Sequence, residues 1–315
     1  MPEPRTGGGI APPWWRSRAT IGTLLILGSA LGFAVMPVFA KLEYRAGVEP
    51  LGLLSWRFVI AAVALWAVVG VRSRVASVAL PPPRRVLGTM ALGGLLLAGE
   101  VVLYFFGLRL IGAGLAEVLL FLFPAWVVLL TAVRSRVRPS TLIVACTLAA
   151  VAGAGLCVGG AVGAGGAAGR SALLAGAGLA IGASVSYAFY VVLADARVAS
   201  DGPLATTTLV ITGGAISLTA AAFITGSTAP HTTEQVALAV GIALVSTVAA
   251  FGLLSAGLAL LPVSHAAVIA TSEPVMAVIL GAVLLGERVG LWQAIGIGLV
   301  VLAIGTILWR DAQAL

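Results

Sequence analysis

The 315 residues are 60% hydrophobic and only 9% charged, with a mean hydropathy of +1.13. Soluble domains carry about 25% charged residues. The composition therefore excludes a soluble enzyme or binding module and indicates an integral membrane protein. We interpret the net charge of +7 as a sign of membrane orientation, and we expect no nucleic-acid partner, no cofactor and no metal ion.

The apolar residues fall into ten runs, which follow a Pro- and Gly-rich tail at residues 1–18 that we expect to be disordered and cytoplasmic. A bilayer core of about 30 Å takes about 20 residues of helix, and each run is long enough to cross it. The sequence therefore predicts an all-α integral membrane protein with ten transmembrane helices. The runs cover residues 20–41, 50–71, 86–109, 113–133, 140–161, 171–194, 203–225, 235–261, 263–285 and 290–309.

The basic residues between the runs indicate how the chain is oriented. With a cytoplasmic N-terminus, the outer loops hold Lys41, Arg45, Arg109, Arg170 and Arg288. The cytoplasmic side then holds Arg5, Arg16, Arg18, Arg72, Arg74, Arg84, Arg85, Arg134, Arg136, Arg138, Arg197 and Arg310. Because positive residues favour the cytoplasmic side, this excess predicts ten helices with both termini cytoplasmic.

A shift of 150 positions brings the first half of the chain onto the second. The matched pairs are Gly107 with Gly257, Leu108 with Leu258, Leu110 with Leu260, Ala116 with Ala266, Val118 with Val268, Pro124 with Pro274 and Gly155 with Gly305. We therefore predict two five-helix repeats, at residues 19–161 and 171–315, joined by a glycine-rich outer linker at 162–170. Because five is an odd number, the repeats are inverted, which is typical of alternating-access transporters that bind substrate between their halves.

The stretch 251–288 is central to this prediction, because its second apolar run carries Glu273 and Pro274 in the middle. A carboxylate in such a run is costly in lipid, so it should face protein or a water-filled cavity. We interpret the mid-span prolines Pro37, Pro124 and Pro274 as kinks or hinges that let helices rock.

These features together resemble the drug/metabolite transporter superfamily, and specifically its EamA-type branch of ten-helix carriers. The resemblance covers nearly the whole chain and implies a bacterial inner-membrane carrier, often an exporter of amino acids, metabolites or drugs. Two positions depart from the pattern: Leu31-Gly32 replaces the family's aromatic-glycine start of the first helix, and Val137-Arg138 is the first-half counterpart of Glu287-Arg288. The residues that carry the resemblance are Gly257-Leu258, Pro262-Val263, Glu273-Pro274, Gly286-Glu287, Gln293-Ala294-Ile295-Gly296 and Gly305, with Gly32-Phe33, Pro37, Lys41 and Arg57 in the first two helices.

Five ionisable side chains lie inside the runs, where charges are costly and usually functional. Glu273 is either a proton-coupling or substrate-amine site, or a buried carboxylate that pairs with Arg57 and fixes helix packing. Glu100 either belongs to that site or neutralises Arg57, whose guanidinium can bind a substrate carboxylate. Glu117 is either an interfacial residue or a ligand. His265 either shuttles protons or is satisfied at the start of its helix.

Aromatic residues inside the runs are candidates to line a substrate cavity, and the alternative for each is simple packing or an interface belt. The candidates are Phe33, Tyr104, Tyr187, Trp126 and Tyr190, together with Trp56 beside Arg57. The motifs Gly155-x-x-x-Gly159 and Gly178-x-x-x-Gly182 predict close contacts between helices, because small residues let backbones approach.

We therefore expect a secondary active transporter that exports a small organic solute by alternating access, with or without proton coupling. One alternative is a facilitative carrier of drugs or lipid-like solutes on the same fold. Another is a membrane-embedded transferase, but the sequence has only two histidines and neither an HExxH nor a GxSxG motif, so we expect no enzyme. The expected partners are a small-molecule substrate and the lipid bilayer, and the duplication is compatible with a monomer or a homodimer.

Overall fold

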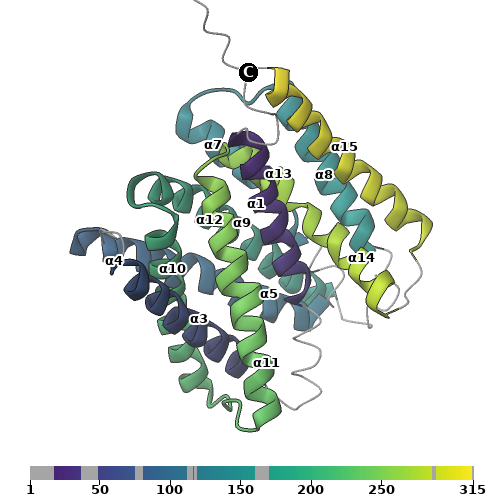
Figure 1. Cartoon of the computed structure of the whole chain (residues 1–315). Coiled ribbons are helices and arrows are strands. Elements are labelled where there is room, and N and C mark those ends of the chain that lie inside the picture. Colours follow the sequence, from purple (N-terminus) through teal and green to yellow (C-terminus); the bar gives the residue numbers. More distant parts are fainter. Residues whose placement is uncertain are drawn as a thin grey trace, which may run out of the picture.

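The structure is a computed structural model of the chain and describes residues 18–36, 49–74, 81–111, 116, 119–159, 170–285 and 289–313. Every regular element in these ranges is a helix (Figure 1). The predicted tail and outer linker lie almost wholly outside the described residues. The elements are α1 (Arg18–Ala34), α3 (Pro50–Arg72), α4 (Pro83–Ala91), η2 (Leu92–Leu97), α5 (Ala98–Ile111), α7 (Phe123–Ser135), α8 (Thr141–Gly159), α9 (Arg170–Asp201), α10 (Pro203–Thr225), α11 (Thr233–Ala243), η3 (Leu244–Ala249), α12 (Ala250–Leu258), α13 (Val263–Ala270), α14 (Ser272–Leu285) and α15 (Leu291–Gln313).

In the described part of the chain, six helices are long and apolar enough to cross a membrane, and four shorter apolar helices accompany them. The six are Pro50–Arg72, Pro83–Gly107, Ser171–Asp201, Pro203–Thr225, Thr233–Leu258 and Val263–Leu280; the four are Arg18–Ala34, Phe123–Ser135, Thr141–Leu156 and Leu291–Ile307. Each predicted apolar run overlaps one of these helices. The all-helical class is confirmed, whereas ten membrane crossings, the inverted repeat and the cytoplasmic termini stay predictions.

Two of the long helices contain a turn of π-helix: η2 lies between α4 and α5, and η3 between α11 and α12. A π turn bonds residues five apart rather than four, so it holds one extra residue and loosens the α-helical bonding around it. Each turn offers a carbonyl to another helix. Leu96 O accepts a 2.8 Å hydrogen bond from Ser186 Oγ, and Ser246 O accepts a 3.0 Å bond from Arg57 Nη2. The two carbonyls are 150 positions apart, which is the offset between the halves.

A break precedes the mid-span proline in both halves. A turn at Thr271 separates α13 from α14, three residues before Pro274. A turn at Phe121 and Leu122 precedes α7, whose first turn holds Pro124. Proline lacks the N–H that would continue the helical bonding, which accounts for a break beside each proline; a hinge role for these prolines stays a prediction.

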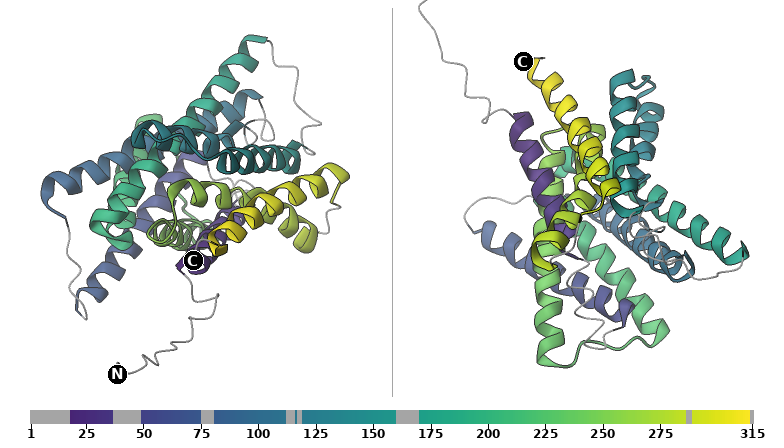
Figure 2. Two further views of the ribbon diagram at one scale, coloured as in Figure 1. Left: turned by 90° about the horizontal axis from the view of Figure 1, so that it is seen from above. Right: turned by 90° about the vertical axis from the view of Figure 1, so that its right-hand side faces the viewer.

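Helices that are distant in sequence pack side by side: α8 along α15, α5 along α9, α3 along α10 and α1 along α12 (Figures 1 and 2). Glycines make several of these contacts close. A Cβ at Gly153 of α8 would lie 2.7 Å from the Gly296 carbonyl oxygen of α15, and one at Gly257 of α12 would lie 2.5 Å from Ile26 Cδ1 of α1. Small residues therefore set these helix separations, as expected for a glycine-rich membrane protein.

One predicted glycine contact is wrong. Among the described residues, nothing lies within 4 Å of a Cβ built at Gly178, and Gly182 makes only an ordinary contact with Leu103. The neighbouring Gly176 instead packs against Gly107 and the residues that follow it in α5. Gly182 thus faces α5 as predicted, whereas Gly178 faces none of the described residues.

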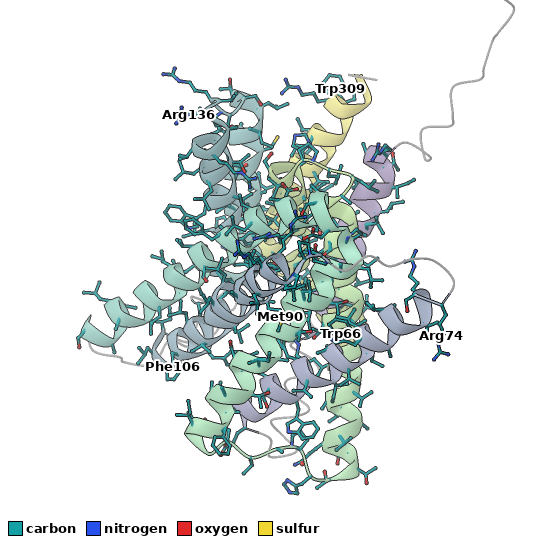
Figure 3. The ribbon with its side chains drawn as sticks, turned by 90° about the vertical axis from the view of Figure 1, so that its left-hand side faces the viewer. Trp66, Arg74, Met90, Phe106, Arg136 and Trp309 are labelled. Carbon is teal, nitrogen blue, oxygen red and sulfur yellow. The ribbon has the colours of Figure 1, made fainter. Side chains whose placement is uncertain are left out.

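The start of α1 and the end of α15 lie at the same end of the molecule (Figures 1 and 2). Figure 3 shows Arg136, just after α7, and Trp309, in the last turns of α15, at that end as well. Arg310 Nη1 also donates a 3.3 Å hydrogen bond to Ser140 Oγ, just before α8. Several arginines that the sequence assigns to the cytoplasmic side thus share one end of the described structure.

Candidate functional site

Arg57 of α3 is buried, with only 5% of its surface exposed, and neutral groups hold its guanidinium. Its Nε donates to Thr247 Oγ1 at 2.6 Å, and its Nη2 donates to the Ser246 carbonyl at 3.0 Å. Its Nη1 lies 2.9 Å from Met36 Sδ. These contacts use three of the five N–H groups of an arginine, and two of them go to η3 in the other half of the chain.

The π turn explains how a main-chain carbonyl becomes an acceptor for Arg57. In a regular α-helix the Ser246 carbonyl would accept from the N–H four residues on, whereas the wider π turn changes that bonding. The hydroxyl of Thr247 in the same turn adds a second acceptor, and Thr247 is fully buried. The local irregularity thus builds a polar receptor inside an otherwise apolar helix.

Two carboxylates lie within electrostatic range of Arg57. Glu100, in the first turn of α5, and Glu273, in the first turn of α14, both interact with its charge. Both also interact electrostatically with Tyr187 of α9. Both carboxylates are half-buried. The structure thus brings together Arg57, Glu100, Glu273 and Tyr187, which the sequence predicted from four different apolar runs.

A chain of aromatic rings passes beside this charged group and joins four helices. Phe33 of α1 meets Phe251 of α12 with ring centroids 4.9 Å apart, and Phe251 lies 6.2 Å from Tyr190 of α9. Tyr190 lies 5.7 Å from Tyr187, which meets Phe123 of α7 at 4.9 Å. The three central rings come from helices of the second half and the two end rings from helices of the first, so the chain of rings crosses the surface where the halves meet.

Four buried polar atoms near the middle of the chain's apolar runs have no hydrogen-bond partner among the described residues. They are the hydroxyls of Ser184, Ser246 and Ser272 and the indole Nε1 of Trp126. Ser246 adjoins Thr247, and Ser272 adjoins Glu273. Buried polar atoms without partners are uncommon in native structures and need a reason, such as a water or ligand.

The other predicted site residues lie apart from the ring chain or outside the described residues. Trp56 is 43% exposed and makes no ring pair among the described residues. Tyr104 pairs with Phe105 at 5.7 Å and packs against a separate cluster around Ala180. Pro124 and Pro274 are buried at the helix breaks. Pro37 and Glu117 lie outside the described residues, and His265 is half-buried in α13.

Sequence reasoning missed the residues that hold Arg57, namely Met36, Ser246 and Thr247, and the rings of Phe251 and Phe123. The pair Ser246-Thr247 interrupts an apolar run and was the available signal. The partnership itself joins residues about 190 positions apart, and nothing in local sequence specifies it. In the described ranges, no group of three His, Cys, Asp or Glu side chains has the arrangement of a metal site.

Comparison with known proteins divides the chain into the same two halves. A sequence profile of the EamA-like transporter family matches residues 20–159 and again residues 174–309. The chain is also similar to the uncharacterized transporter YcbK of Bacillus subtilis (strain 168), with 28% identity over 289 residues, 89% of this chain and 90% of that protein. A solved crystal structure matches with a TM-score of 0.76 at 19% identity, covering 91% of this chain and 96% of that one. That last likeness is one of fold.

Proposed function

The chain belongs to the EamA-like transporter family, and on that premise we propose that it is a secondary transporter whose site for a small organic solute is centred on Arg57. The position of Arg57 is the main support for this proposal. Neutral atoms of the opposite half hold its guanidinium, and two carboxylates lie within electrostatic range. A charge inside an apolar helix is expensive and usually marks a substrate or ion pathway.

The chemistry of the site suits a solute that carries both charge and apolar surface. Arg57 can bind a carboxylate or other anionic group with its planar donors. Glu273 and Glu100 can bind an amine or a proton. The rings of Phe33, Tyr187 and their neighbours offer apolar faces, which also attract cations. Amino acids, metabolites and cationic drugs are therefore the solute classes that we propose.

Alternating access in this proposal uses the helix breaks at Thr271 and at Phe121–Leu122. A break before a proline lets the two parts of a helix change their angle. Because the breaks occupy matching places in the two halves, one half can rock against the other around a fixed site. The proposal also includes ten membrane spans, inverted repeats and cytoplasmic termini. It places the protein in a bacterial inner membrane, where it transports its solute outward with Glu273 as the coupling carboxylate.

The test is flux in proteoliposomes with and without an imposed pH gradient, first with pooled amino acids and then with cationic dyes. We compare the wild type with Glu273→Gln and with Glu234→Gln, an exposed glutamate at the start of α11, as the matched control. We expect flux that follows the gradient, is lost in Glu273→Gln and is unchanged in Glu234→Gln. Flux that ignores the gradient and survives Glu273→Gln would identify a facilitative carrier and return Glu273 to a packing role.

A further inference from the structure

A second polar feature lies away from Arg57, in a groove between α4, η2, α7 and α9. The groove has a volume of about 480 Å³, which is within the range of small-molecule sites. Its polar lining comes from two arginines and one serine, and the rest is apolar. None of the residues that bind Arg57 lines it. We call it the arginine groove; its defining residues are Gly88, Leu95, Arg134, Leu193, Arg197 and Ser200.

The two arginines come from different halves of the chain; a backbone carbonyl holds Arg134, and Arg197 lies beside a glycine of α4. Arg134, in the last turn of α7, donates a 3.2 Å hydrogen bond from Nη1 to the Val192 carbonyl of α9. Arg197 of α9 lies across α4 where Gly88 leaves room, since a Cβ there would be 3.2 Å from Arg197 Nη2. Both guanidiniums therefore keep N–H groups for a further acceptor.

The nearby acidic groups do not neutralise the positive charge of the groove. Asp201 pairs with Arg85 at 2.8 Å, so a third arginine, outside the groove lining, engages this carboxylate. Asp195 interacts electrostatically with Arg134 but does not line the groove. Two arginines thus face the groove with one carboxylate close by, and an anion is the ligand whose charge complements them.

The apolar part of the groove indicates that this anion belongs to an amphiphile. Leu95 is 72% exposed and Leu193 is 41% exposed, beside the arginines. In a membrane protein, exposed leucines of this kind face hydrocarbon, whereas arginines near helix ends face lipid headgroups. Basic pockets between membrane helices suit acidic headgroups. A soluble anion would use the arginines and leave the leucines without a role.

We propose that the arginine groove binds one anionic phospholipid, with its phosphate between Arg134 and Arg197 and its acyl chain along Leu95 and Leu193. Because α7 belongs to the first half of the chain and α9 to the second, the bound lipid would contact both halves. This site is independent of the solute site at Arg57 and does not require transport to occur.

The experiment is titration of the purified full-length protein by native mass spectrometry with phosphatidylglycerol, phosphatidylcholine or inorganic phosphate. The test variant is Arg134→Gln/Arg197→Gln. The control is Arg72→Gln/Arg74→Gln, which removes the same charge from exposed positions at the end of α3. We expect the test variant to bind phosphatidylglycerol about 30-fold more weakly, at the usual contribution of an arginine near a lipid surface, and the control to bind as the wild type does.

Three results would overturn the proposal. Equal loss in the control would mean diffuse surface charge, equal binding of phosphatidylcholine would mean no selection for the headgroup, and displacement by inorganic phosphate would mean a soluble-anion site. If the double variant does not fold, Arg197→Gln alone serves, because its side chain makes no hydrogen bond or ion pair to another helix in the described part of the chain. The single variant should bind phosphatidylglycerol about fivefold more weakly, and unchanged binding would refute the site.

Discussion

The two π turns are alike in backbone and different in chemistry. Each turn interrupts a long helix, and each gives a carbonyl to a helix of the opposite half. The donor to η2 is the neutral hydroxyl of Ser186, whereas the donor to η3 is the charged guanidinium of Arg57. The surroundings differ as well, since η2 packs against α10 through glycines, whereas η3 carries the buried hydroxyls of Ser246 and Thr247.

The same kind of turn therefore serves close helix packing in one half and holds a buried charged side chain in the other. At η2, a Cβ on Gly93 would clash with the Val210 carbonyl, and one on Gly213 would clash with the Met90 carbonyl (Met90 is labelled in Figure 3). The helices there touch backbone to backbone and leave no space. At η3 the same kind of turn accepts a long polar side chain, so the polarity of the site resides mainly in the second half and in its partner Arg57.

The largest effect is expected at Gly93, where η2 packs against α10. In Gly93→Ala the new methyl group would overlap the Val210 carbonyl of α10, and backbone cannot move aside as a flexible side chain can. Overpacking of this kind costs about 1–3 kcal/mol or more, so we expect little folded protein in the membrane, measured by detergent-extracted monodisperse yield. Gly178→Ala, where the space is open, is the control and should express normally. Normal yield of Gly93→Ala would show that η2 is not a tight packing seam.

The next largest effect is expected at Arg57, where the chemical role of η3 is tested. Arg57→Lys keeps the charge but loses the geometry that serves Thr247 and Ser246 together. Hydrogen bonds from charged groups contribute about 1.5–3 kcal/mol each, so we expect roughly 100-fold lower flux in proteoliposomes at unchanged protein abundance. Arg72→Lys, at the exposed end of the same helix, should transport as the wild type does. Equal flux in Arg57→Lys would mean that the arginine only balances charge.

The smallest effect is expected at Ser186, which tests whether the hydrogen bond at η2 serves packing alone. Ser186→Ala removes the 2.8 Å bond to Leu96 O, and bonds between membrane helices average about 0.6 kcal/mol. We expect the melting temperature in detergent to fall by only about 1 °C while flux stays within a factor of two or so. A flux loss as large as that of Arg57→Lys would place η2 in the transport site and contradict the division of roles.

Much of the fold followed from composition and periodicity, because apolar runs of membrane length form helices wherever they fall. One physical rule, that charges are expensive in lipid, singled out Arg57, Glu100 and Glu273, and the structure brings both carboxylates within electrostatic range of Arg57; their role in transport stays a prediction. The paired prolines lie beside the two helix breaks, and their role as hinges stays a prediction. These inferences depended on the chemistry of single residues, which the sequence states directly.

The features that the sequence did not predict depended on which helix faces which. The π turns have no local signature, since η2 reads LGGLLL and η3 reads LVSTVA, and both would pass for regular helix. Thr247 was overlooked because a hydroxyl inside an apolar helix usually bonds to its own backbone, as Thr208 and Thr306 do here. The Gly178 contact failed for a related reason: glycine spacing marks a smooth strip on a helix but not the partner that covers it.

The extra residue in η3 changes the rotational phase of the helix that contains it. One residue corresponds to about 100° of rotation about a helix axis, so α11 and α12 are out of register with each other although they form one continuous rod. The rod can therefore turn its polar turn towards α3 and its glycine-bearing strip, with Gly257, towards α1. An uninterrupted α-helix would tie these two orientations together. The π turn lets the acceptors of Arg57 and the contact between α1 and α12 be aligned independently.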